Sequence, residues 1–420
     1  MSNWQKVNLD KLCFFEKGKT GLAKAIPGDY PLVTTSAERK TNDSYQFDTK
    51  AVCIPLVSST GHGHASLNYV HYQEGKFALG TILVALIPKD ETILNAQFLH
   101  LYLSRLKDMI LVPLMSGAAN VSLSISKIKT VEIPLPPIDE QLKIVELFKN
   151  LVNENNELVE EINTQQSLLK QLKQTILQEA IEGKLTAKYR AKNPDIGTAK
   201  ELLEQIKTEK EQLVKDKKIK ASKPLAPINE DEIPFDIPPT WEWYRLGDYS
   251  INRDGERKPI SQIERENRAK IYDYYGASGV IDKIDGYTHD GIFLLIGEDG
   301  ANLISRTTPI AFIANGKFWV NNHAHVLEFL NIVSLSYVEK YINAINLKPY
   351  VTGGFQPKLS QANLNNILIS IPPIEEQKEI VATIEKLFAI CDELEAEINQ
   401  NKTTVDNLMA TVLKEAFEQQ

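Results

Sequence analysis

The chain has 420 residues, of which 43% are hydrophobic and 24% charged, as in an ordinary soluble protein. This composition excludes collagen-like, low-complexity and largely disordered classes, and no apolar run approaches the roughly 18 residues that a membrane helix needs. The N-terminal residues show no apolar signal-peptide core. The cysteines Cys13, Cys53 and Cys391 are too far apart for a CxxC motif or a disulfide framework, so we expect a cytoplasmic protein.

The net charge of −8 argues at first against binding to nucleic acid, but the acidity is confined to two segments. Residues 136–182 hold 4 Lys+Arg against 9 Asp+Glu, and residues 372–420 hold 4 against 11. The remainder of the chain is therefore close to neutral. The two acidic segments are also copies of one another.

An internal repeat of constant offset relates the two halves of the chain. The sequence PPIDEQ at Pro136–Gln141 returns as PPIEEQ at Pro372–Gln377, and 19 of the 47 positions from Pro136 to Glu182 are identical. Chance would give about three, so this pattern indicates duplication. Weaker matches lie upstream. Gly117, Leu123 and Ser124 match Gly353, Leu359 and Ser360 at the same offset, whereas Trp4 with Trp241 and Gly75-Lys76-Phe77 with Gly316-Lys317-Phe318 match at other offsets.

Each repeated segment predicts one long helix, because no Pro or Gly interrupts it and acidic residues occupy the first turn. Apolar residues step by four and three, which is the heptad pattern of a coiled coil. The predicted seam consists of Ile144, Phe148, Leu151, Asn155, Leu158, Ile162, Leu169 and Leu172 in the first helix, and of Ile380, Ile384, Leu387, Cys391, Leu394, Ile398, Asn401 and Leu408 in the second. The alternative is that each helix lies on its own globular domain.

The polar breaks in the seam suggest how the helices pair. Antiparallel pairing with full overlap would set Asn155 against Asn401 and Gln165 against Cys391, so that a buried asparagine layer fixes the register. Parallel pairing would instead set Asn155 against Cys391. We expect the antiparallel arrangement, with Leu158 buried in the seam.

Residues 183–240 change in composition and predict a linker. A charged helix is expected over Thr198–Lys220, followed by an extended Pro-rich stretch to Pro239. The lysine cluster here is either a solvated face or a phosphate contact.

Residues 1–135 and 241–371 read as two variable α+β units. The runs at residues 51–57, 80–87, 291–296 and 310–314 predict strands, and those at 95–109 and 334–345 predict helices. The expected fold class is thus α+β, with two globular domains separated by two long antiparallel coiled-coil helices in a pseudo-twofold repeat.

Polar and glycine-bearing loops of the two units are the candidate recognition surfaces, because they carry amide, hydroxyl and cationic side chains and glycine permits close approach. Were the partner DNA, Asn and Gln would pair with adenine, and Arg and Lys with guanine. The candidate residues are Thr34, Thr35, Ser36, Arg39, Lys40, Gly61, His62, Gly63, His64, Asn120, Ser122, Glu298, Asp299, Asn302, Arg306, Asn321, Asn322, His323, His325, Gln356 and Lys358. Each could instead form only a loop hydrogen bond. The His-x-His pairs lack a third ligand at metal-binding spacing, so we expect no metal site.

Catalytic motifs are absent from the sequence. There is no GxxxxGK[ST] nucleotide loop, no Asn/Asp-Pro-Pro-aromatic motif of an amino-methyltransferase, no nuclease core of the Pro-Asp…Glu-x-Lys type and no Gly-x-Ser-x-Gly elbow. We therefore expect no catalytic residues.

The two Pro-Pro-Ile-[DE]-Glu-Gln motifs, the paired long helices and the Glu-Gly-Lys-Leu sequence at Glu182–Leu185 together resemble the specificity subunit of type I restriction-modification systems. The likeness covers the whole chain, although no Gly-Lys-Leu follows the second helix up to Gln420, so an open repeat is expected. It implies target recognition domains at 1–135 and 241–371, spacer helices at 136–182 and 372–420, and a linker at 183–240.

The resemblance further implies a non-catalytic subunit that reads an asymmetric, two-part site in double-stranded DNA. Two modification (methyltransferase) subunits and restriction subunits would dock on it and would themselves bind S-adenosylmethionine, ATP and Mg. Two other hypotheses remain open. One is a coiled-coil scaffold presenting two protein-binding domains, and the other is a single-chain DNA methyltransferase or nuclease, for which the motifs are missing.

Overall fold

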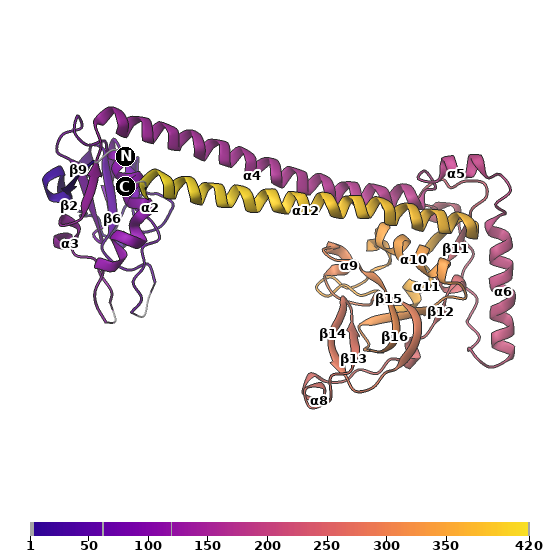
Figure 1. Ribbon diagram of the computed structural model, residues 1–420. Coiled ribbons are helices and arrows are strands. Elements are labelled where there is room, and N and C mark those ends of the chain that lie inside the picture. Colours follow the sequence, from indigo (N-terminus) through magenta and orange to yellow (C-terminus); the bar gives the residue numbers. More distant parts are fainter. Residues whose placement is uncertain (1–3, 61–62, 119, 419–420) are drawn as a thin grey trace. The chain divides into compact units, whose positions relative to one another are not determined.

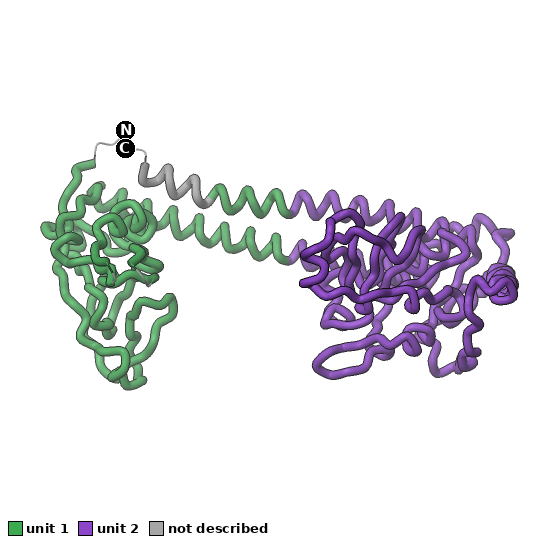
Figure 2. The backbone as a smooth tube through the Cα atoms, turned by 90° about the horizontal axis from the view of Figure 1, so that it is seen from below, with its two compact units in different colours: residues 1–163, 399–420 green, residues 164–398 purple. Residues whose placement is uncertain are grey.

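The computed structural model describes residues 4–60, 63–118 and 120–418, with side chains described to residue 408. The chain divides into two compact units (Figures 1 and 2), residues 1–163 with 399–420 and residues 164–398, called unit 1 and unit 2 below. Each contains a globular α+β part and segments of the two long helices, α4 (Ile138–Ile181) and α12 (Ile374–Glu418). Within the described residues, no helix has both the length and the apolar character needed to cross a membrane.

Unit 1 is built on two four-stranded sheets, with the strand orders β2-β9-β6-β7 and β4-β3-β8-β5. Helix α2 (Ala96–Ile110) packs its apolar face on the first sheet, where Val52, Leu86 and Phe98 are fully buried. The strands and remaining helices are β1 (Gln5–Asn8), α1 (Leu9–Leu12), β2 (Cys13–Lys17), β3 (Tyr30–Val33), β4 (Lys40–Asn42), β5 (Phe47–Asp48), β6 (Ala51–Pro55), β7 (His71–Gln73), β8 (Lys76–Leu79), β9 (Leu83–Pro88), α3 (Ile125–Lys129) and β10 (Glu132–Leu135).

Unit 2 is built on one six-stranded sheet of order β12-β17-β15-β16-β13-β14. Its linker helix α6 (Ala199–Lys215) is held by Lys210, whose ammonium donates to three carbonyls around the end of α7, including those of Asp248 and Ser250 at 2.8 Å. The other elements are α5 (Ala187–Lys192), β11 (Glu242–Arg245), α7 (Leu246–Tyr249), β12 (Ile251–Asn252), α8 (Gln262–Glu266), β13 (Tyr272–Gly276), β14 (Gly279–Ile284), β15 (His289–Gly297), α9 (Asn302–Ser305), β16 (Ala311–Val320), β17 (Ala324–Glu328), α10 (Ile332–Ala344), α11 (Gln361–Asn365) and β18 (Leu368–Ile371).

The two globular parts share one topology although their sequences have diverged. The order β2-β9-β6-β7 in unit 1 corresponds to β12-β17-β15-β16 in unit 2. Each unit also has one parallel pair, β13 with β16 within the single sheet of unit 2 and β3 with β8 within the second sheet of unit 1. The cross-strand pair Asp48 with Lys76 returns as Asp290 with Lys317, and each lysine follows a glycine of φ +75° or +84°. The shared Gly-Lys-Phe sequence therefore marks one structural position in both units.

The Pro-Pro-Ile-[DE]-Glu-Gln motif fastens each long helix to its globular unit. In unit 1, β1 pairs with β10, and the indole nitrogen of Trp4 donates to Glu140 at 3.0 Å. The buried Gln141 amide donates to the carbonyls of Ile93 and Pro136, each at 2.8 Å. The helix, the first strand and the strand before the motif are thus joined at one point.

The same arrangement in unit 2 is more complete. Strand β11 pairs with β18, and the indole nitrogen of Trp241 donates to the fully buried Glu376 at 2.8 Å. The hydroxyl of Thr186 donates to the other oxygen of Glu376 at 2.6 Å, and the Arg190 guanidinium forms an ion pair with the same oxygen. A buried carboxylate is tolerated here because it has a cation and two further donors.

The helices are antiparallel, as the sequence predicts. In unit 2, the ammonium of Lys173 contacts carboxylates of both Asp392 and Glu395 at 2.8 Å, while Thr186, just after α4, bonds to Glu376 at the start of α12. As the chain advances along α4 and past its end, the contacted residues of α12 have lower numbers, which defines an antiparallel pair. The first turns of α4 differ from the predicted seam, because Ile144 and Phe148 pack against the globular core of unit 1.

The register of the helices differs from the one predicted. Pairing Gln165 with Cys391 would set residue 173 against 383, whereas Lys173 contacts 392 and 395. Asn401 is exposed, so the predicted asparagine layer is wrong. One position per heptad is well buried instead, comprising Ile162, Leu169 and Ile176 in α4 and Cys391, Ile398 and Val405 in α12. The apolar residues between them are half-exposed, namely Leu158, Leu172, Leu394 and Leu408.

The first prediction tests this register by crosslinking. With residue 173 beside 392 and 395, the buried Ile176 comes level with the native Cys391. Ile176→Cys should therefore form a disulfide with Cys391 under mild oxidation, detected by mass spectrometry of the proteolysed chain. Gln165→Cys is the matched control and should remain reduced. A disulfide between residue 165 and Cys391 would contradict the observed register and support the one predicted from the sequence.

A second prediction separates the buried from the exposed seam positions. Ile162 is 6% exposed and Leu158 is 46% exposed. Ile162→Ala should lower the free energy of unfolding by about 2–4 kcal/mol, since it leaves a cavity, and Leu158→Ala by about 1 kcal/mol or less. Urea unfolding followed by circular dichroism measures both. Equal losses would mean that Leu158 lies in the helix–helix interface.

Candidate nucleic-acid interface

A hairpin at residues 352–358 stands beside the loop that follows β15 in unit 2. Thr352 and Lys358 exchange two backbone hydrogen bonds, of 2.9 and 2.7 Å. The loop joins the hairpin through the amide of Gly300, which donates to the carbonyl of Pro357 at 3.0 Å. Main-chain hydrogen bonds therefore hold the two segments as one surface.

Unit 1 has the equivalent hairpin at residues 116–122, at the same positions of the internal repeat. Ser116 and Ser122 exchange two backbone hydrogen bonds of 2.9 Å, and Ser58, in the loop after β6, donates to the carbonyl of Val121 at 3.0 Å. A Cβ at Gly63 would come 2.6 Å from the carbonyl oxygen of Ala118, which shows how closely the loop and hairpin approach. Candidates Gly61 and His62 lie outside the described residues.

Several candidate residues are exposed, most of them in these loops and hairpins and one, Lys40, at the start of β4. The side chains of Lys40, His64, Asn120, Ser122, Asn322 and Gln356 form no hydrogen bond or ion pair with any other residue that the structure describes. Lys358 is also exposed, but its ammonium lies 3.2 Å from Glu298. Thr35 is half-buried and Gly63 exposed. The exposed side chains supply amide, hydroxyl and cationic groups, which are the groups that contact base edges and phosphates.

Arg39 has an internal role that the sequence did not indicate. Its guanidinium donates to the side chain of Gln73 at 3.0 Å, to the carbonyl of Tyr72 at 3.2 Å and to Nδ1 of His71 at 3.1 Å. Burial, and then the Arg39 cation, lowers the pKa of His71 to about 4, so the ring stays neutral and accepts. Arg39 thus anchors its loop to β7 and is not free to read a base.

The neighbouring Thr34 and Ser36 also stabilise this loop. Thr34 is buried and its hydroxyl lies 2.7 Å from that of Ser36, which in turn donates to the carbonyl of Glu38. Lys40 is therefore the exposed candidate of this segment whose side chain has no partner among the described residues, whereas Thr35 is half-buried.

Arg306 and Asn302 are structural in unit 2. The guanidinium of Arg306 donates to the carbonyls of Ile342 and Ile345 at 3.2 and 2.7 Å, which satisfies the C-terminal end of α10, and burial lowers its pKa to about 10. The Asn302 side chain bonds to the backbone of Thr308. The cation expected to read guanine is therefore part of the scaffold.

A buried ionic cluster lies beneath the hairpin of unit 2. His325 is fully buried, with Nδ1 2.6 Å from the Asp254 carboxylate and Nε2 2.8 Å from the carbonyl oxygen of Leu359, so both nitrogens act as donors. Glu298 is bound by the Arg257 guanidinium at 2.6 Å. His325 and Glu298 therefore support the hairpin from below and do not face outward as predicted.

Burial opposes ionisation of Asp254, but the hydrogen bond and charge of His325, together with Arg257, hold its pKa below the usual value.

The loop after β16 also contains both buried and exposed candidate residues. Asn321 is buried and its side-chain oxygen accepts the amide of His323, whose ring contacts Asp299 at 2.7 Å. His323 and His325 thus have separate partners and do not converge as a metal pair.

Sequence reasoning missed three contributors to this surface. Asp254 and Arg257 lie far before the histidine that they surround, and nothing local in the sequence relates them. Phe355, between Gly354 and Gln356, could have been noticed as an aromatic residue in a glycine-bearing loop. It is the most exposed of the large hydrophobic residues in the described part of the chain.

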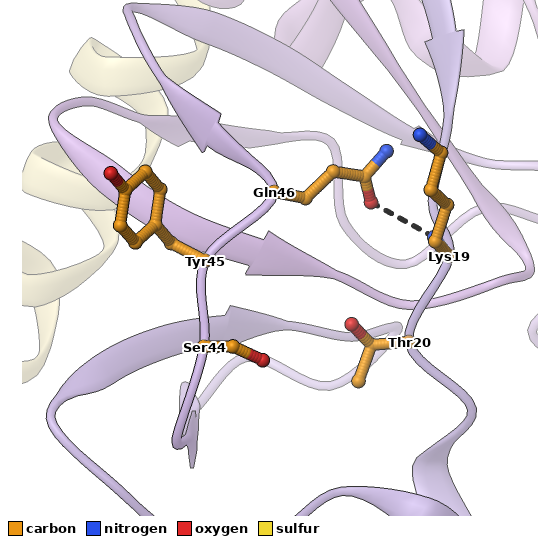
Figure 3. A pocket seen from close by; sticks show the side chains of 5 residues that line it. All are labelled: Lys19, Thr20, Ser44, Tyr45 and Gln46. Carbon is orange, nitrogen blue, oxygen red and sulfur yellow. Dashed lines mark hydrogen bonds between the residues drawn. The ribbon is translucent and has the colours of Figure 1, made fainter.

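A shallow depression of about 350 Å³ on unit 1 is lined by Lys19, Thr20, Ser44, Tyr45 and Gln46 (Figure 3). The Gln46 side chain accepts the amide of Lys19 at 2.9 Å and donates to the carbonyl of Lys17 at 3.0 Å. Among the described residues, no unpartnered buried polar atom lies in this lining. Its polar groups serve the local loop, and we assign no ligand to it.

The sequence matches the model of the family described as "Type I restriction modification DNA specificity domain" over residues 1–166 and 238–401. These two ranges cover both globular parts and most of both long helices. The chain belongs to this family.

Relatives and solved structures agree with this assignment. The type I restriction enzyme EcoEI specificity subunit of Escherichia coli is 29% identical over 269 residues, which cover 57% of this chain but only 44% of that subunit. The EcoDI specificity subunit of Escherichia coli is 23% identical over 429 residues, covering 99% of this chain and 88% of the relative. A chain in a solved structure of a type I R-M system, 16% identical and covering 99% of this chain and 98% of its own, has the same fold with a TM-score of 0.65.

A third prediction concerns the ionic cluster. Asp254→Ala should lower the free energy of unfolding by about 3–5 kcal/mol, because it leaves the buried His325 without its partner. Since the folded-state pKa of Asp254 is below its ordinary 3.8, its contribution is present above that pH and is lost as the pH falls through the folded-state pKa. Urea unfolding at pH 7 and pH 3 measures this. Asn322→Ala, an exposed neighbour, is the control and should change stability by less than about 0.5 kcal/mol.

Proposed function

We propose that the chain is the DNA specificity subunit of a type I restriction-modification system and that each unit reads one half of a two-part, asymmetric site in double-stranded DNA. The observation that carries the proposal is the repeated surface. Both units present a loop and a hairpin joined by the same backbone hydrogen bonds, yet the exposed side chains differ between them. The specificity subunits among its relatives support this reading.

Asn120 and Gln356 are the leading base-reading residues. The repeat places them at corresponding positions of the two hairpins, and both are exposed. A carboxamide can make two hydrogen bonds to adenine in the major groove, so one adenine in each half-site fits this pair. Lys40 is suited to phosphate contact, which positions the protein without reading sequence.

We also propose that the chain is not itself a catalyst. Methyl transfer and cleavage would belong to two modification subunits and to restriction subunits, which would bring S-adenosylmethionine, ATP and Mg, in the cytoplasm. The net charge of −8 supports this division, because a chain with little excess positive charge gains little affinity from counterion release. The partners would supply much of the phosphate contact.

The long helices offer a docking surface for such partners and would set the length of the spacer between the half-sites. Leu172 and Leu394 in unit 2 are 46% and 42% exposed, although both follow the heptad pattern. Leu158 and Leu408 repeat this half-exposure in unit 1. A helix from a modification subunit laid along these leucines would complete their burial.

The fourth prediction tests modularity. Replacing residues 241–371 with the corresponding unit of a relative should change one half of the methylated site and leave the other half intact, because each unit has its own core. Methylome sequencing of a host that carries the chimera with its modification subunits measures the result. The reciprocal exchange of residues 1–135 is the control. A simultaneous change of both halves would contradict independent reading.

The fifth prediction tests the hairpin amides. Gln356→Ala should relax one position of the half-site read by unit 2, at about 1–3 kcal/mol of lost discrimination, and Asn120→Ala should do the same in the other half. Lys40→Ala should weaken binding to all DNA sequences alike. It should also reduce the slope of log K against log salt concentration by about one. Methylation of a randomised target library, followed by sequencing, separates these outcomes. Unchanged preference after both amide substitutions would place the reading surface elsewhere.

A further inference from the structure

Phe355, in the hairpin of unit 2, is the most exposed of the large hydrophobic residues in the described part of the chain. Its relative exposure is 110%, greater than in an extended reference peptide, whereas Phe14, also among the exposed aromatic residues, is 56% exposed. Withdrawing a phenylalanine side chain from water is favourable. A phenyl ring held fully in solvent therefore offers binding energy that the folded chain itself does not use.

The hairpin that carries this ring is firmly held. The paired amides of Thr352 and Lys358 close it, and a Cβ on Gly353, which has φ +86°, would lie 2.5 Å from the Gln356 carbonyl oxygen. Below it, the amide of Leu359 donates to the Glu298 carbonyl at 2.8 Å, and the Leu359 carbonyl accepts from the buried His325. The hairpin therefore holds the ring in a defined position, so little conformational entropy of the backbone is lost when the ring binds.

We propose that Phe355 is a wedge that enters the base stack of the half-site read by unit 2, next to the base pair contacted by Gln356. This proposal rests on the proposed function. Apolar side chains that insert between bases unstack a step and bend or open the duplex, and an unstacked base stacks favourably on an aromatic ring. An enzyme partner that modifies a base must take that base out of the stack, and a wedge would lower the energy of doing so.

The surroundings favour a base stack over a protein partner. Hot spots of protein interfaces lie among apolar neighbours that exclude water. Phe355 instead has Gly354 before it and the exposed Gln356 after it, with the Lys358 ammonium at the base of the hairpin. An isolated ring flanked by an amide and a cation matches the stacking, base-edge and phosphate contacts of nucleic-acid binding.

The internal repeat makes the wedge specific to one half-site. At the position of the repeat that corresponds to Phe355, the sequence of unit 1 has Ala119, preceded by Ala118. The amide is retained as Asn120 but the ring is not. Unstacking should therefore be asymmetric, occurring in the half-site of unit 2 and not in that of unit 1.

The test uses the full chain assembled with its modification subunits and duplex DNA carrying 2-aminopurine at single positions of each half-site, as assigned by the unit exchange. Binding of the unsubstituted complex should raise fluorescence at one step of the unit 2 half-site only. Phe355→Ala should abolish this rise and weaken binding about 10- to 100-fold, whereas Phe355→Trp should preserve both. An abasic site at the same step should restore the affinity of Phe355→Ala, because the unstacking is already done.

Ile263→Ala is the matched control, since Ile263 is an exposed apolar residue of unit 2 on α8 and should have no effect. Unchanged binding and fluorescence for Phe355→Ala would overturn the wedge. So would a loss of subunit assembly with normal DNA binding, which would make the ring a protein-docking residue. A failure of the unsubstituted complex to prefer any DNA sequence would instead refute the proposed function, and this outcome is distinct from the other two.

Discussion

The hydrogen bond from a tryptophan to a carboxylate at the start of each long helix is the contact on which the rest of the chain depends. Glu140 and Glu376 accept the indole N–H of Trp4 and Trp241, and so connect the first strand of each unit to its long helix. In unit 2 the carboxylate is fully buried and also binds Arg190 from the linker that follows α4. Removing one of its donors would leave that buried charge partly uncompensated. This is a physical reason for both copies of the repeated motif to carry a glutamate at this position.

The sequence could predict the helices and their direction but not their register. The heptad pattern and the absence of Pro and Gly were sufficient for α4 and α12. The register failed because Asn155 and Asn401 were assumed to face each other, whereas Asn401 is exposed and Lys173 selects a different alignment through Asp392 and Glu395. Long-range ion pairs of this kind leave no periodic signal in the sequence.

For the candidate site, the sequence could indicate which loops are polar and rich in glycine, but not which of their side chains have internal partners. Residue type alone could not show that Arg39 and Arg306 satisfy backbone carbonyls, because their partners are distant along the chain. The common topology of the two units was equally hidden. A single Gly-Lys-Phe sequence was the visible trace of it, since cross-strand packing tolerates many side chains as long as the alternation of faces is kept.

The backbone hydrogen bonds that hold the two hairpins determine which substitutions the protein can tolerate. Because amides and carbonyls are common to almost all residues, substitutions at hairpin positions other than the positive-φ glycines Gly117 and Gly353 leave the closing hydrogen bonds in place. A mutation at the position of Gln356 can thus alter what the surface contacts with little effect on folding, whereas one at Asp254 cannot. The backbone frame of each hairpin is therefore separable from its exposed side chains, so a point mutation at an exposed position should change the chemistry of the surface without unfolding the unit.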